Sequence, residues 1–159
     1  MAQPLRIFCR EDINLNVAVR GTTVVLARAN PDDVLQHWVQ DFSAVGTVTD
    51  DEGQRAFALV NKATGQALVN KNIISPSDKQ VHVQLGPYLS EVRVDLSMLW
   101  TLGAKDLGGG FREVRVLRDT AQTLNGLWGN VKDGTVVGVH PSRPDAPNAV
   151  WKLAPVYDQ

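Results

Sequence analysis

Short apolar runs of four to six residues, bounded by turn-forming residues, recur along the whole chain. They include residues 24–27, 57–60, 81–85, 114–117 and 136–139. Runs of this length between glycine, proline and asparagine are typical of β-strands. No window of ten or more residues shows the 3.6-residue period of an amphipathic helix. The pattern therefore predicts an all-β protein.

Residues 57–69 give the clearest strand pair, because two apolar runs flank the turn sequence Asn-Lys-Ala-Thr-Gly. Gly65 can take the positive φ that closes a bulged hairpin turn. Residues 31–38 could instead form a short helical turn, with Pro31 in its first turn and Asn30 as its cap.

Three segments end alike, in Trp38, Trp100 and Trp151, and each follows an apolar run and a loop. Their unequal spacing argues against a solenoid, whose units must match their neighbours. About four strands per segment predict three lobes closed into a threefold barrel capped by hairpins, which leaves no open sheet edge. We expect one tryptophan per lobe to fill the centre, rather than to stack on a ligand.

The charge balance gives no reason to expect a nucleic-acid partner. The chain has sixteen basic and seventeen acidic side chains, so its formal charge is −1. Binding to nucleic-acid phosphates needs an excess of basic side chains. The run of Arg112, Arg115 and Arg118 is diluted by Glu113 and Asp119, and we expect it to be a solvated strand face.

The sequence also predicts an intracellular, membrane-free setting. Cys9 is the single cysteine, so no intramolecular disulfide can form, and its apolar neighbours predict a buried thiol. The N-terminal residues lack a signal-peptide pattern, and no apolar run approaches the length of a membrane span. We therefore expect a cytoplasmic or nuclear protein.

Enzymatic and metal chemistry are not predicted. His37, His82 and His140 lack cysteine or carboxylate partners at metal-ligand spacing. The glycines at 108–110 are not followed by the Lys-Ser/Thr of a phosphate loop, and no Gly-x-Ser-x-Gly motif occurs. We expect no metal, no cofactor and no catalysis.

Several segments resemble the Euonymus lectin domain of plants. They are residues 6–10 (RIFCR), 36–38 (QHW), 57–65 (FALVNKATG), 99–101 (LWT), 109–112 (GGFR), 133–135 (DGT) and 151–153 (WKL). The resemblance covers residues 5–155 as one domain, with tails at 1–4 and 156–159. It implies a ricin-B-like β-trefoil with three pseudo-repeated lobes, carbohydrate binding, no cofactor, and residence in cytoplasm and nucleus. It also implies a link to abscisic acid and to salt and drought stress.

The third lobe departs from the family pattern at its sugar site. The family shows an acidic residue after a Leu-Asn pair, but here Asn125 is followed by Gly126 and Leu127. The two family tryptophans align with His140 and Ser142, the family asparagine with Asn148 and its glutamine with Ala149. The loop to Asp133 is shortened. Losing both tryptophans removes the stacking platform, so the resemblance implies a degenerate third-lobe site.

Trp128, the fourth tryptophan, lies outside the threefold pattern and is a candidate replacement platform. It stands between glycines in a predicted hairpin turn, near Asp133. The alternative is that it packs back over the barrel rim. The third-lobe candidates for carbohydrate binding are Asn125, Trp128, Asp133, His140 and Asn148.

The second lobe offers Gln84, Tyr88 and Asp95, with Tyr88 two residues past a strand end. A tyrosine there can also merely cover the core. The first lobe has Asn30, Asp32 and Asp33 but no aromatic residue, so these are interpreted as turn and cap formers.

Two hypotheses follow. The chain is a lectin that binds a glycan or glycoprotein through a relocated site, or a trefoil that has lost sugar binding and recognises a protein partner. The sequence leaves the oligomeric state open.

Overall fold

A computed structural model describes residues 3–43, 48–70, 81–88 and 95–157, and this part of the chain is built from strands and short 3-10 helices. The strands are β1 (Leu5–Cys9), β2 (Leu15–Arg20), β3 (Thr23–Arg28), β4 (Trp38–Asp41), β5 (Ala58–Asn61), β6 (Gln66–Val69), β7 (Val81–His82), β8 (Gln84–Pro87), β9 (Trp100–Leu102), β10 (Val114–Val116), β11 (Asp119–Gly126), β12 (Val137–Pro141) and β13 (Trp151–Pro155). The 3-10 helices are η1 (Val34–Gln36), η2 (Leu96–Met98) and η3 (Pro147–Ala149). The predicted all-β class is confirmed. Of the predicted tails, residues 1–2 and 158–159 lie outside the described residues.

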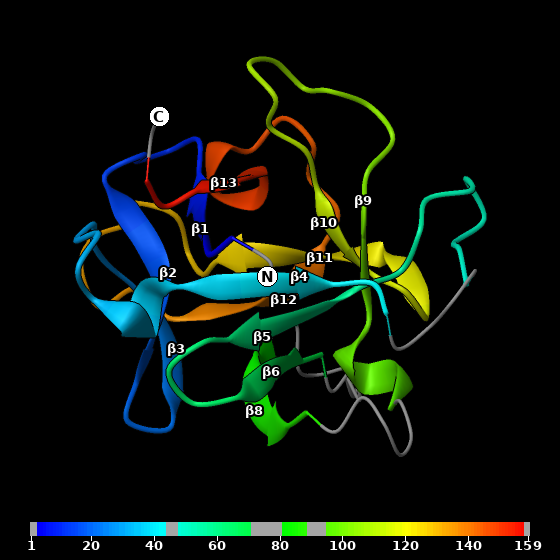
Figure 1. The fold of residues 1–159 in the computed structure, drawn as a ribbon. Helices are drawn as coiled ribbons and strands as arrows, with labels where there is room; N and C mark the ends of the chain where they lie inside the picture. Colours follow the sequence, from blue (N-terminus) through cyan, green and yellow to red (C-terminus); the bar gives the residue numbers. More distant parts are fainter. Residues whose placement is uncertain (1–2, 44–47, 71–80, 89–94, 158–159) are drawn as a thin grey trace.

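Six strands close into a ring. β1 pairs with β4, β4 pairs with β5, and a bridge between Phe57 and Trp100 joins the β5 strand line to β9. β9 pairs with β10, a bridge between Arg112 and Trp151 joins the β10 strand line to β13, and β13 returns to β1. Figure 1 shows the first and last strands, in blue and red, side by side. The strand pairs β2–β3, β6–β8 and β11–β12 complete the three lobes, which confirms the predicted β-trefoil.

Trp38, Trp100 and Trp151 occupy equivalent places in the three lobes. Each is fully buried, lies two residues after the end of a 3-10 helix and pairs through its backbone with the first strand line of its own lobe. Their indole N–H groups donate to the carbonyls of Val17 in β2 (2.9 Å), Leu68 in β6 (3.2 Å) and Leu124 in β11 (2.8 Å). A buried indole needs such an acceptor. The expectation that these rings fill the centre is therefore confirmed.

Aspartate caps start two of the 3-10 helices. Asp33 before η1 and Asp95 before η2 each accept a hydrogen bond from the backbone N–H two residues on, whereas η3 begins with Pro147. The helical turn expected in residues 31–38 is present, but its cap is Asp33 and not Asn30. The Asn30 side chain closes the preceding turn by accepting from the Asp32 N–H at 3.0 Å.

The hairpin expected in residues 57–69 is confirmed as β5 and β6. Gly65 has a φ of 70° and its N–H donates to the Asn61 carbonyl at 2.8 Å. The positive φ explains the glycine, because a side chain would be strained there.

The expectation of a solvated arginine face is wrong for two of its three residues. Arg112 donates to the carbonyls of Gly103 and Ala104 at 3.0 and 2.8 Å. Arg115 is half-buried and forms ion pairs with Glu113 and Glu52. Glu113 lies two residues before Arg115 in the same segment, but Glu52 and the Gly103 and Ala104 carbonyls come from loops folded against β10. Charge patterning along one strand cannot reveal the contacts made by those loops.

Cys9 is fully buried in the core, as predicted. Burial raises the pKa of its thiol, because desolvation disfavours the thiolate. We expect Ellman's reagent at pH 8 to label Cys9 only after unfolding in urea. Rapid stoichiometric labelling of the folded protein, followed by absorbance, would contradict this placement.

No helix among the described residues is long and apolar enough to cross a membrane.

Candidate functional site

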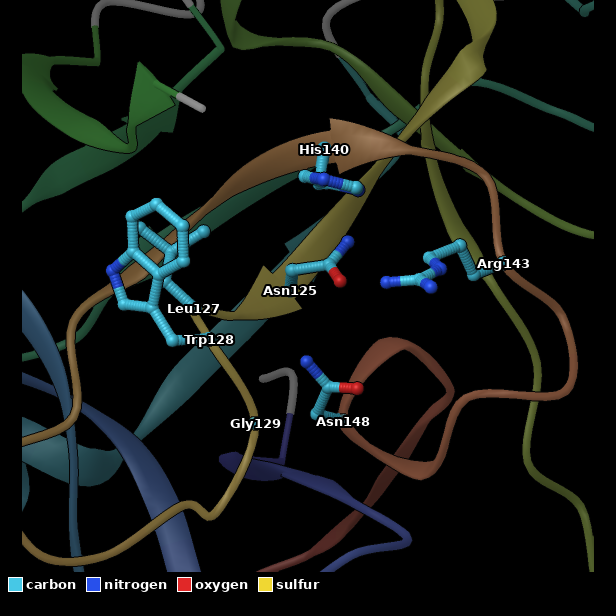
Figure 2. Close-up of a pocket in the computed structure, with 7 residues that line it drawn as sticks. All are labelled: Asn125, Leu127, Trp128, Gly129, His140, Arg143 and Asn148. Carbon is cyan, nitrogen blue, oxygen red and sulfur yellow. The ribbon is translucent and has the colours of Figure 1, made fainter. Parts of the chain in front are cut away.

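A pocket of about 360 Å³ lies in the third lobe, between the end of β11, the turn that follows it and the loop after β12. It is lined by Asn125, Leu127, Trp128, Gly129, His140, Arg143 and Asn148 (Figure 2). Four sequence-predicted candidates, Asn125, Trp128, His140 and Asn148, therefore meet in one place. They come from segments that the pairing of β11 with β12 and the position of η3 bring together.

Two amide side chains form the floor of this pocket. Asn125 is buried near the end of β11, and its Nδ2 donates to the carbonyl and the hydroxyl of Thr123 at 3.0 and 3.2 Å. Asn148 in η3 donates through Nδ2 to the Gly126 carbonyl at 2.7 Å. These bonds fix both amides and leave their Oδ1 atoms as acceptors for a ligand.

Trp128 forms one wall and is 78% exposed, so it does not pack back over the rim. Its φ is 76°, and Gly129 and Asn130 continue the left-handed turn at 68° and 48°. A bulky residue rarely takes positive φ, and the conformation costs about 1–2 kcal/mol. Strained, exposed residues of this kind gather at ligand sites.

His140 lies on β12 opposite Thr123 and lines the pocket. Its Nδ1 lies 3.2 Å from the Pro141 carbonyl. That contact favours the tautomer with the proton on Nδ1, which leaves Nε2 as a further acceptor.

Arg143 is the charged lining residue that sequence analysis did not predict. The residue before it is anchored on both sides, because the Ser142 N–H donates to the Ala121 carbonyl at 2.7 Å and its hydroxyl donates to Glu113. In Figure 2 the guanidinium extends across the pocket toward the two amides. The sequence did carry a signal for Arg143: it is a basic residue between Pro141 and Pro144, two residues past the end of a strand.

Asp133, the fifth third-lobe candidate, does not line the pocket. It accepts from the Arg28 N–H at 2.9 Å and forms an ion pair with Arg20 at 3.2 Å. These partners hold the pKa of Asp133 below its ordinary value. Asp133 therefore links the third lobe to the β2–β3 hairpin through a hydrogen bond and an ion pair.

The second-lobe candidates also lie away from this pocket. Gln84 is exposed on β8, and Asp95 caps η2. Tyr88 is half-buried against a small apolar cluster that contains Leu99. Burial and the neighbouring Asp41 carboxylate raise the pKa of Tyr88, so its phenol stays protonated.

A second hollow of about 400 Å³ adjoins the first pocket. It shares Leu127, Trp128 and Gly129 with the first pocket and adds His82, Asn130, Lys132, Thr135 and Val136. Trp128 therefore lines both hollows. Within the described residues, no group of three or more histidine, cysteine or acidic side chains is placed to hold a metal.

Two comparisons place the chain among plant proteins. It is 39% identical over 158 residues to ricin B-like lectin R40G3 of Oryza sativa subsp. japonica, covering 96% of this chain and 74% of that protein. It is 33% identical over 157 residues to ricin B-like lectin EULS3 of Arabidopsis thaliana, covering 95% of this chain and 47% of that protein. The chain spans less than half of rice R40C1 and R40G2 as well. No protein-family model matches it.

Solved structures show the same fold at low identity. The designed threefold-symmetric protein ThreeFoil superposes with a TM-score of 0.73 at 18% identity, over 95% of this chain and 97% of its own. A ricin B-like lectin of Macrolepiota procera, solved with lactose, superposes with a TM-score of 0.70 at 11% identity, over 98% and 97%.

Proposed function

The chain belongs to the ricin B-like lectin family, of the Euonymus-lectin type, and from that premise we propose that it binds carbohydrate through the third-lobe pocket. The observation that carries the proposal is the exposed ring of Trp128 beside two fixed amide oxygens. A pyranose has an apolar C–H face that packs on an aromatic ring, and hydroxyls that donate to amide acceptors. The pocket supplies both at once.

The third-lobe site is, in this proposal, rebuilt and not lost. The family tryptophans are replaced by His140 and Ser142, and Ser142 anchors the loop while His140 lines the pocket. Trp128 supplies the stacking ring from the turn after β11. The strained turn supports this role, because a core-packing role would not require the ring to stand in solvent.

The remaining family properties are proposed with it. The chain binds glycans or glycoproteins without catalysis, acts in cytoplasm and nucleus, and serves plant responses to abscisic acid and osmotic stress. Its relatives are named lectins, which supports the non-catalytic assignment. The second candidate is a protein-binding trefoil, favoured by the same exposed Trp128, since exposed tryptophans are common anchors in protein interfaces.

Replacing Trp128 with alanine is expected to weaken sugar binding at least about tenfold, because the stacking face is lost. Mannose- and galactose-containing oligosaccharides would be titrated calorimetrically into the wild-type protein and the variant. In the wild type, quenching of tryptophan fluorescence should report Trp128, since the other three tryptophans are buried.

The matched control is Tyr157→Ala, which removes another exposed aromatic ring outside the pocket. It should bind sugar as the wild type does. No binding of any oligosaccharide at millimolar concentration would defeat the lectin proposal. Capture of a plant protein that free sugar does not release, lost in Trp128→Ala, would then favour the protein-binding trefoil.

Trp128→Gly should lose sugar binding without losing stability. Glycine takes positive φ freely, so relief of the strain offsets its larger entropy loss on folding, and the free energy of unfolding should stay equal or rise by about 0.5–1 kcal/mol. Urea denaturation followed by circular dichroism measures this. A drop of more than about 1 kcal/mol would mean that the ring packs on the fold.

A further inference from the structure

The proposed sugar pocket carries an unpaired cation where carboxylate chemistry was expected. Among the described residues, no aspartate or glutamate lines the pocket, whereas Arg143 does. The described lining of the adjoining hollow also contains no acidic residue and adds Lys132 and His82. Neither lining, as far as the structure describes it, offers a carboxylate to accept from vicinal sugar hydroxyls.

The charge of Arg143 is not neutralised within the part of the chain that the structure describes. The ion pairs there involve Arg20 and Arg115, and Arg143 takes part in none. Asp145, two residues further along the same loop, forms no ion pair with it. Other acidic groups near the pocket are engaged, since Glu11 accepts from the Val131 N–H at 2.7 Å and Asp133 is paired with Arg20.

The donors and acceptors of the pocket are thus separated in space. The amide oxygens of Asn125 and Asn148 can accept from neutral hydroxyls, and Trp128 can cover the apolar ring face. Arg143 reaches in from the other side with a planar fork of N–H donors and no acceptor (Figure 2). A guanidinium fork matches the two oxygens of an anionic group, and such charged hydrogen bonds are about twice as strong as neutral ones.

We propose that the pocket selects an acidic saccharide, namely a pyranose that carries a carboxylate or a sulfate ester, with its anionic group on Arg143 and its ring on Trp128. This inference rests on the proposed sugar-binding function and names the ligand class for the same site. Lys132 adds a second basic side chain in the adjoining hollow, so an acidic oligosaccharide that extends beyond the first ring meets a further cation there.

The test compares matched ligands that share the galactose ring and differ in their anionic groups. Digalactose, digalacturonate and a sulfated digalactose would be titrated by calorimetry at 50 and 500 mM salt into wild type, Arg143→Gln, Arg143→Lys and Lys105→Gln. Lys105 is an exposed cation outside both hollows. Lys105→Gln therefore changes the net charge as Arg143→Gln does, but leaves the lining of both hollows unchanged. The galacturonate and sulfate arms distinguish the two sources of the anion.

We expect wild type and Lys105→Gln to bind at least one acidic ligand about tenfold more tightly than digalactose at low salt, the size of one charge-assisted contact. The preference should shrink at high salt. It should fall to within about twofold in Arg143→Gln, and Arg143→Lys should keep only part of it, because lysine lacks the fork.

Equal binding of neutral and acidic ligands by wild type overturns the acidic-saccharide proposal while leaving the lectin function intact. An acidic preference that survives in Arg143→Gln overturns it equally. If no ligand of this series binds the wild type, the acidic-saccharide proposal fails. The lectin function fails with it only if the mannose- and galactose-containing oligosaccharides do not bind either.

Discussion

Replacing Trp151 with alanine is expected to lower the free energy of unfolding by about 3–5 kcal/mol. The ring is fully buried, and the backbone of Trp151 forms a β-bridge with Arg112 and pairs with Cys9 of β1. Its removal leaves a large cavity at one of three equivalent core positions, and it strips the Leu124 carbonyl of its 2.8 Å donor. Because Trp151 lies two residues after the end of η3, its loss should also disturb the position of Asn148, and sugar binding should weaken.

Urea unfolding followed by circular dichroism measures this loss. Trp151→Phe separates the two contributions, because it keeps most of the apolar volume but leaves the Leu124 carbonyl without the indole donor, a change that costs about 1–3 kcal/mol. The free energy of unfolding of Trp151→Phe should therefore lie between those of the wild type and Trp151→Ala. A loss below about 1 kcal/mol for Trp151→Ala would show that the core does not depend on the threefold tryptophans.

Gln36→Leu should cost about 2–4 kcal/mol, although leucine is close to glutamine in size. Gln36 is only 2% exposed, and both ends of its amide are satisfied. Its Oε1 accepts from Asn16 Nδ2 at 2.8 Å and from the Asn30 N–H at 3.0 Å, while Nε2 donates to the Arg28 carbonyl at 2.9 Å. Leucine leaves the buried Asn16 amide and the partly buried backbone groups of Asn30 and Arg28 without their hydrogen-bond partner. Polar groups without a partner are costly at low dielectric.

Gln84→Leu is the matched control, since Gln84 is an exposed glutamine on β8. Its substitution should change stability by no more than about 0.5 kcal/mol. If Gln36→Leu and Gln84→Leu lowered the free energy of unfolding equally, the hydrogen bonds of Gln36 would contribute nothing specific to stability. Ala149 lies two residues before Trp151, as Gln36 lies two residues before Trp38. Its methyl side chain cannot form the hydrogen bonds that Gln36 forms in the first lobe.

Much of the fold could be predicted because its determinants are local in the sequence. Alternating apolar runs mark strands through a two-residue period, and Gly65 marks a turn through its positive φ. The repeat of Trp38, Trp100 and Trp151 predicted the threefold centre, since only equivalent positions explain one large ring per lobe. The cap of η1 was assigned to the wrong residue, because Asn30 and Asp33 are both good cap formers and only the backbone selects between them.

The sequence by itself determined the strands, the three tryptophan-centred lobes and the candidates Asn125, Trp128, His140 and Asn148. Only the tertiary structure decided which of the candidates meet. It placed Asp133 against Arg20, 113 residues away in the chain. It also showed that the charged residue lining the pocket is Arg143 and not Asp133. The physical reason is that strand patterns come from short-range periodicity, whereas the charge of a pocket depends on which distant loops fold over it and on which carboxylates are already paired.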